Sequence, residues 1–347
     1  MLIGAAHAGA PYTFPSGSGT QFLDGMNELF NRGYEVPKAY CTPDFATKYA
    51  LQSSWGTTPT TMTQLLQTWP FVAALDLPWE TRGGVIVFTA FSFVNGTTNW
   101  IRPDPVSTRL NADRIEIKAA ASHLLSEYNG RALTFVFGSW EGDWAMQDSF
   151  SVAPFPYVSH LMADRFAAFY NNRQRAIDEA RAETPSDCKI LHAVEVNRPL
   201  DARQLPHLRR ICRDLKGRIK PDLISFSAYQ GTIVDQGGFG PSFAAWEAAT
   251  RPAFIKAIRA IKYAFPNTPW YVGEFGFPEG IELPPGRSVD PMIRVIHDVA
   301  EDEGATMLLY WQTFDNEETS PGVPRGFYLV KPDGSSSQAT ITLEALL

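Results

Sequence analysis

The sequence predicts an α/β fold in which eight strand-then-helix units close into a (β/α)8 barrel with a short C-terminal extension. Short β-rich runs alternate with longer helical patterns along all 347 residues, and there are eight such runs. Most of the runs are almost continuously apolar, which is typical of strands buried on both faces of a parallel sheet. The chain shows no internal repeat, linker or low-complexity tract, so residues 1–347 are expected to form a single domain.

Each predicted strand is a β-rich apolar run that a helical or loop-forming segment follows. The first run lacks the basic residues that precede the apolar core of a signal peptide, and we therefore interpret it as a strand. The eight expected strands are 2–8, 35–41, 83–93, 132–140, 189–197, 222–229, 269–276 and 306–314.

The segments between the strands carry helical patterns. Residues 20–33 end in a glycine that can serve as a C-cap. Residues 109–130 have apolar positions at helical spacing, with Asn111 or Asp113 available for capping. The other expected helices are 61–69, 159–183, 204–217, 253–265 and 291–305.

A doubly wound open sheet is the alternative fold. Such a sheet normally carries a glycine-rich phosphate fingerprint after its first strand, and residues 7–19 (HAGAPYTFPSGSG) do not form one. The barrel is therefore favoured.

Composition argues against several classes of function. A net charge of −7 and a pI near 5.4 argue against nucleic acid or an acidic membrane surface as the main partner. No apolar stretch approaches the roughly 18 residues of a membrane span. The three cysteines and six histidines are scattered, so we expect no metal site and no cofactor. Compartment and oligomeric state are left open.

The C-terminal ends of the strands carry the chemistry in a barrel of this kind. After the fourth strand, the stretch SWEGDW (139–144) places Glu141 and Asp143 between Trp140 and Trp144. Glu274 stands in the seventh strand, on the opposite side of the barrel mouth. Two facing carboxyl groups are what glycoside cleavage needs, one as proton donor and one as nucleophile. The two indoles would desolvate the acid, raise its pKa and offer faces for sugar stacking.

The chain resembles the clan A glycoside hydrolases, which are (β/α)8 barrels that retain anomeric configuration. The resemblance covers nearly the whole chain as architecture and is specific at WEGDW, VGEFG and YWQTFDNE. It implies that Glu141 is the acid/base and Glu274 the nucleophile. It also implies that Trp311 is a sugar platform and that Tyr229 donates a hydrogen bond to the nucleophile.

The sequence departs from the clan in two places. Trp140 stands where an asparagine usually precedes the acid/base, and Lys38 is the nearest cation to the place of the usual strand-two arginine. The first departure leaves open whether Asp143 shares or takes the acid role. His7 on the first strand, and Asn197 with Glu195 on the fifth, are further candidates for binding substrate.

The leading hypothesis is a retaining glycoside hydrolase that acts without metal on a β-linked oligo- or polysaccharide. One alternative is a barrel that binds carbohydrate but has lost catalysis. A metal-dependent barrel hydrolase or sugar isomerase is the other, and it would need clustered ligands such as His-x-His. The expected partner is the saccharide, with neither nucleic acid nor membrane.

Overall fold

The fold is described from a computed structural model. The description covers residues 1–9, 20–49, 58–94, 96, 106–147, 160–201, 210–233, 239–279, 283, 288–320 and 323–347.

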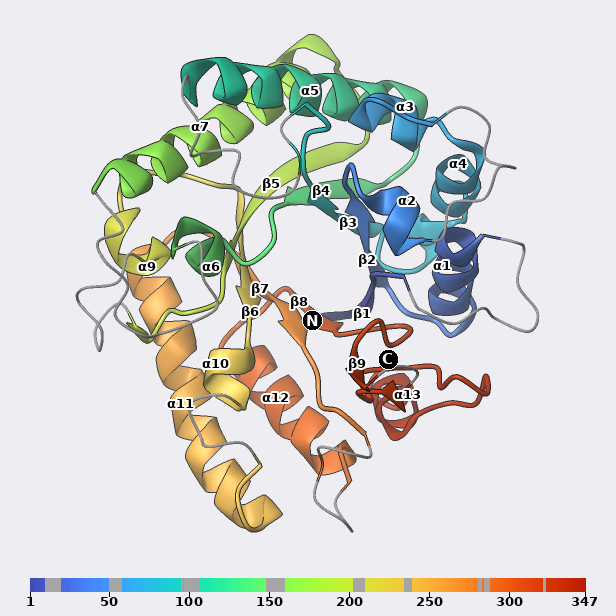
Figure 1. Cartoon of the computed structure of the whole chain (residues 1–347), viewed down its shortest axis with the longest axis vertical. Coiled ribbons are helices and arrows are strands. Elements are labelled where there is room, and N and C mark those ends of the chain that lie inside the picture. Colours follow the sequence, from blue (N-terminus) through green and yellow to red (C-terminus); the bar gives the residue numbers. More distant parts are fainter. Residues whose placement is uncertain are drawn as a thin grey trace.

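Eight parallel strands close into a barrel in the order of the sequence, from β1 beside β2 round to β8 beside β1. All eight predicted strands are confirmed, and Figure 1 shows them at the centre of a ring of helices. Their bounds are β1 Leu2–His7, β2 Val36–Cys41, β3 Val85–Ala90, β4 Thr134–Gly138, β5 Lys189–Val196, β6 Leu223–Ser227, β7 Trp270–Phe275 and β8 Met307–Tyr310.

The helices follow the predicted pattern with differences at their ends. The described α-helices are α1 Gln21–Asn31, α2 Phe45–Lys48, α3 Met62–Leu66, α4 Trp69–Leu75, α5 Val106–Glu127, α6 Gly142–Gln147, α7 His160–Glu183, α9 Ile211–Asp214, α10 Tyr229–Thr232, α11 Phe243–Ala264, α12 Asp290–Asp302 and α13 Gln338–Glu344. Within the described ranges, none is long and apolar enough to cross a membrane.

Two expectations about helix ends were wrong. Helix α5 already includes Val106, so Asn111 and Asp113 lie inside it and cannot cap it. Helix α11 begins ten residues before the predicted start, because the Ser242 hydroxyl accepts from the Ala245 N–H and caps it there. Its Pro252 lies within the helix. Of the predicted helix 204–217, residues 204–209 lie outside the described part.

An apolar layer fills the half of the barrel in which the strands begin. Val36, Val87, Val136, Ala193 and Tyr271 come from five strands and pack there with Leu223, Met307 and Leu309. Side chains alternate between the two faces of a strand, so residues two positions further along also point inward. In β2, β5 and β6 those residues are Lys38, Glu195 and Ser225, and all three are buried. A polar layer therefore lies next to the apolar one, nearer the C-terminal ends of the strands.

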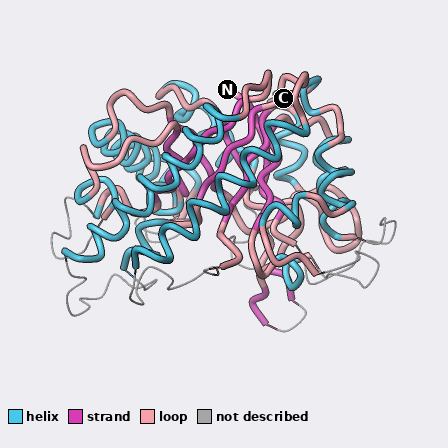
Figure 2. Tube along the Cα trace, turned by 90° about the horizontal axis from the view of Figure 1, so that it is seen from above, coloured by secondary structure: helices cyan, strands magenta, loops and turns pink. Residues whose placement is uncertain are grey.

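The two chain termini lie at one end of the barrel, and the hairpin of β9 (Glu318–Ser320) and β10 (Val323–Pro324) lies at the other (Figure 2). The C-terminal helix α13 returns to α1, where Arg32 pairs with Glu344 at 2.9 Å. The extension thus contributes a hairpin at the end where the strands finish and a helix at the end where they begin.

A buried ion pair joins α5 and α7, two long helices of the outer ring. Arg173 of α7 donates to both carboxylate oxygens of Asp113 of α5 at 3.0 and 2.9 Å, and to the Ala90 carbonyl at 2.8 Å. Both side chains are 1% exposed. Removing one partner of such a pair leaves a buried charge without compensation.

We therefore predict that Arg173→Met lowers the free energy of unfolding by about 3–5 kcal/mol. The matched control is Arg114→Met, which breaks the outer pair of Arg114 with Glu179 between the same two helices. That pair is partly exposed, so the loss should be about 0–1 kcal/mol. Urea unfolding of both variants measures the difference, and equal losses would contradict the prediction.

Candidate active site

The polar layer of the barrel is an ion-pair network centred on Lys38. The Lys38 ammonium donates to Glu195 Oε2 at 3.2 Å and to the Gly273 carbonyl at 3.0 Å, and it lies 3.6 Å from Glu274 Oε2. Ser225 Oγ donates to the same Glu195 oxygen at 2.9 Å. Burial works against the Lys38 ammonium, but the charges of Glu195 and Glu274 outweigh it and raise its pKa.

An irregularity in β7 turns Glu274 toward this network. Strict alternation after the inward Tyr271 would send Gly273 inward and Glu274 outward. The register between β6 and β7 shifts, so that Phe226 pairs with Val272 but the next residue, Ser227, pairs with Glu274. One extra residue on β7 therefore moves Glu274 to the inner face. The extra residue is Gly273, where an added Cβ would lie 1.8 Å from Ser225 Oγ.

Glu141 reaches the same space through an unusual backbone conformation. Its φ of 36° makes it the only described residue other than glycine with a positive φ. Its N–H donates to Glu195 Oε1 at 2.8 Å, and Ser227 Oγ donates to its side-chain Oε1 at 3.3 Å. Such strained conformations persist only where the surroundings hold them, and they concentrate at functional sites.

The environment separates the two carboxyl groups electrostatically. Burial raises the pKa of Glu141 well above its usual range, and the negative charges of Glu274 and Glu195 raise it further. Burial also raises the pKa of Glu274, to about 7, while Lys38 and a hydrogen bond from Tyr229 oppose the rise. Of the two carboxyls, Glu141 is therefore the more readily protonated. Glu274 has the Lys38 ammonium beside it, which favours its ionised form.

Aromatic residues follow β6 and β8, the two strands that flank β7. Tyr229 is half-buried at the start of α10, and its ring meets Phe327 edge-on at 6.3 Å. Trp311 follows β8, and its Nε1 donates to Glu317 Oε1 at 2.8 Å. Arg325 donates to the other oxygen of Glu317 at 2.7 Å. Glu317 therefore holds the Trp311 indole in place, and Arg325 holds Glu317.

Asp143 has a different environment from Glu141. Its carboxylate accepts the backbone N–H groups of Asn197, Arg198 and Ile211 at 2.7–2.9 Å, and its side chain is fully buried. Asn197 Oδ1 accepts the Asp143 N–H in return at 3.1 Å. This reciprocal pair fastens the start of α6 to the end of β5. Gly142 belongs to the same contact, since an added Cβ would lie 2.4 Å from the Tyr170 hydroxyl.

Trp144 and His7 have partners of their own. The Trp144 ring packs under the guanidinium groups of Arg198 and Arg210 at 5.3 and 5.6 Å. His7 is fully buried and contacts the Gln21 carbonyl at 2.8 Å, and burial lowers its pKa to about 4. Trp140 is half-buried directly before Glu141.

Sequence reasoning missed several members of the network. Ser225 and Ser227 are inward-facing positions of β6, and period-two alternation from the apolar Leu223 could have identified them. Glu317 lies beyond β8, the last strand of the barrel, and no sequence pattern indicated its contact with Trp311. Glu195 was expected to bind a hydroxyl group of the substrate, but in the structure it accepts hydrogen bonds from protein groups.

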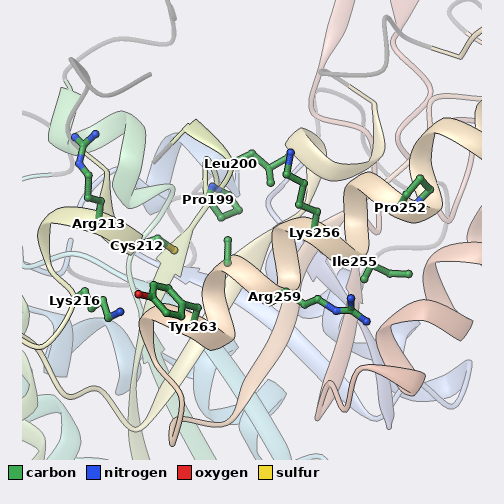
Figure 3. A pocket seen from close by; sticks show the side chains of 11 residues that line it. Pro199, Leu200, Cys212, Arg213, Lys216, Pro252, Ile255, Lys256, Arg259 and Tyr263 are labelled. Atoms are coloured by element: carbon green, nitrogen blue, oxygen red, sulfur yellow. The ribbon is translucent and has the colours of Figure 1, made fainter. Parts of the chain in front are cut away.

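A separate groove of about 870 Å³ lies on the outer wall, between α9 and α11 (Figure 3). Leu200 and Cys212 belong to its apolar lining, and Lys216 and Lys256 are among its basic residues. No carboxylate belongs to the described lining, so the groove is distinct from the glutamate network. Elsewhere in the described ranges, no three His, Cys, Asp or Glu side chains are grouped to hold a metal ion.

Known proteins match this chain in fold only. No family model and no curated sequence matches it. Among solved structures, it is similar to an exo-β-1,4-mannosidase from Opitutaceae bacterium strain TAV5, with a TM-score of 0.59 and 14% identity over 99% of this chain and 58% of the other. A GH5_18 protein from Streptomyces cattleya gives 0.60 and 14%, over 99% and 79%. A β-glucuronidase from Ruminococcus gnavus gives 0.52 and 11%, over 99% and 49%.

The chain thus spans about half to four fifths of these solved structures. The resemblance to clan A glycoside hydrolases is confirmed at the level of the barrel fold.

The contacts of Asp143 generate a prediction that separates it from Glu141. Asp143→Asn places an amide donor against backbone N–H groups and should lower the free energy of unfolding by about 2–3 kcal/mol. Glu141→Gln should leave stability nearly unchanged or raise it, because it removes a buried ionisable group. Thermal and urea unfolding of the two variants measure this. A stable Asp143→Asn protein would show that its carboxylate is free for another role.

Proposed function

We propose that the protein is a retaining glycoside hydrolase that cleaves a β-linked oligo- or polysaccharide. The observation that carries the proposal is the pair of buried carboxyl groups, Glu141 after β4 and Glu274 in β7. They are close enough for the charge of Glu274 to raise the pKa of Glu141. The proposal is further supported by the fold that the chain shares with a mannosidase and a glucuronidase.

In the proposed mechanism, Glu274 attacks the anomeric carbon while the glycosidic C–O bond breaks. Glu141 gives its proton to the departing oxygen, so the leaving group departs as a neutral alcohol and a glycosyl ester forms on Glu274. Glu141, now a carboxylate, then takes a proton from a water molecule. That water attacks the anomeric carbon and releases Glu274 as a carboxylate.

The other residues have supporting roles in this proposal. The Lys38 ammonium and the Tyr229 hydroxyl favour the ionised form of Glu274. Trp311 and Trp140 offer indole faces for stacking on the sugar. Asn197, Asp143, Trp144 and His7 have buried protein partners, so we assign them to holding the site rather than to the saccharide. Residues 1–347 are taken as one catalytic domain.

Covalent labelling tests the nucleophile. A 2-fluoro glycosyl inhibitor carrying the matching sugar should label Glu274, because the fluorine slows hydrolysis of the ester, and peptide mass spectrometry should locate the label there. Glu274→Ala should abolish both labelling and turnover of aryl glycosides. A label on another residue, or a product of inverted configuration by NMR, would contradict the mechanism. Binding of saccharide without any turnover would favour the non-catalytic barrel.

The leaving group tests the acid. Glu141→Gln should lower kcat/KM about 10²–10⁴-fold for poor leaving groups, which need a proton to depart. Activated aryl glycosides need little protonation and should lose much less in the first step. Azide should restore turnover and give a glycosyl azide, because it attacks the ester without a general base. Equal losses for both kinds of substrate, with no azide rescue, would remove Glu141 from the acid role.

A further inference from the structure

We propose that Glu195 is a positioning residue that joins the two catalytic glutamates, holding the backbone of Glu141 with one oxygen and the cation of Glu274 with the other. This inference rests on the proposed function, because Glu195 can contribute to catalysis only if Glu141 and Glu274 are the catalytic residues. It concerns a third carboxylate that touches neither the bond to be cleaved nor the nucleophilic atom.

The first arm of the link is the hydrogen bond from the Glu141 N–H to Glu195 Oε1, at 2.8 Å. A buried backbone N–H needs an acceptor, and a carboxylate is a stronger acceptor than a carbonyl. This hydrogen bond is made by Glu141, whose backbone φ of 36° is unfavourable for any residue other than glycine. Glu195 therefore holds the main chain in the conformation that directs the Glu141 carboxyl toward Glu274.

The second arm runs through Lys38. Glu195 Oε2 accepts from Lys38 Nζ at 3.2 Å and from Ser225 Oγ at 2.9 Å, while the same ammonium lies 3.6 Å from Glu274 Oε2. Lys38 and Glu195 side chains are each 3% exposed, so water screens their charges weakly. The position of the cation beside Glu274 thus depends on a carboxylate three strands away from β2 in the barrel order.

The charge of Glu195 acts on both catalytic groups in the same direction. The titratable and charged groups around the network are Lys38 and Tyr40 on β2, Glu141 after β4, Tyr170 on α7, Tyr229 on α10, Tyr271 and Glu274 on β7, and Glu317 beyond β8. Glu195 raises the pKa of Glu141 and the pKa of Glu274, whereas Lys38 lowers the pKa of both glutamates.

The test is the pH profile of kcat/KM for Glu195→Gln, which keeps the shape of the side chain and removes its charge. The acid limb of the bell reports ionisation of Glu274, and the basic limb reports loss of the proton from Glu141. With one negative charge fewer beside them, both groups ionise more easily. Both limbs should therefore move to lower pH, by about one pH unit, the scale for removing a charge near a carboxyl.

Two further variants distinguish charge from structure. Ser225→Ala removes a hydrogen bond to the same oxygen without changing any charge, and both limbs should stay where they are in the wild type. Lys38→Met removes the opposite charge and should move both limbs to higher pH. Thermal unfolding checks that each variant folds, and the test stands on Glu195→Gln and Ser225→Ala if Lys38→Met does not fold.

A titration that needs no turnover separates this inference from the proposed function. Protein with ¹³Cδ-labelled glutamate is titrated by NMR, and Glu141→Gln and Glu274→Gln assign the two signals. In Glu195→Gln both titrations should move to lower pH, even if the wild type cleaves no glycoside. Unshifted titrations in a folded Glu195→Gln protein would overturn the inference. A wild type without turnover but with the expected shifts would overturn the proposed function alone.

Discussion

The structure of the site depends on keeping acidic side chains inside the barrel, away from water. Burying a charge is costly unless an opposite charge and hydrogen bonds accompany it. Glu195, Glu274 and Glu141 are all buried, and Lys38 lies within 4 Å of the first two. The apolar layer lies next to this network, on the side where the strands begin, and closes that side of the barrel interior.

The same balance of charge makes the environments of the two buried glutamates different. Glu274 lies 3.6 Å from the Lys38 ammonium, and Lys38 and Tyr229 oppose the rise of its pKa. Glu141 lies further from the cation and feels two negative neighbours, so its protonated form is favoured. Burial raises the pKa of both carboxyls, and the cation beside Glu274 is the main difference between their environments.

The comparison with solved structures shows how little sequence identity the barrel fold requires. A barrel similar to a mannosidase and a glucuronidase persists here at 11–14% identity, because the fold asks for alternation and packing volume rather than particular residues. Function resides in the few side chains that the barrel presents at its strand ends.

The sequence by itself determined the eight strands, most of the helices and the strand ends at which Glu141 and Glu274 stand. Apolar runs separated by helical patterns suffice for that, whereas the inward positions of Lys38, Glu195 and Ser225 follow from period-two alternation only once the apolar layer is known. Only the tertiary structure decided how the two catalytic candidates face each other. The register shift that turns Glu274 inward arises from pairing between β6 and β7, which are far apart in the sequence.

The left-handed backbone of Glu141 likewise depends on an acceptor that another strand provides. Asp143, two residues away in the same acidic stretch, is fastened into the protein by backbone groups of residues 197, 198 and 211. Local sequence cannot distinguish these neighbouring carboxyls, because their environments are made by residues more than fifty positions distant.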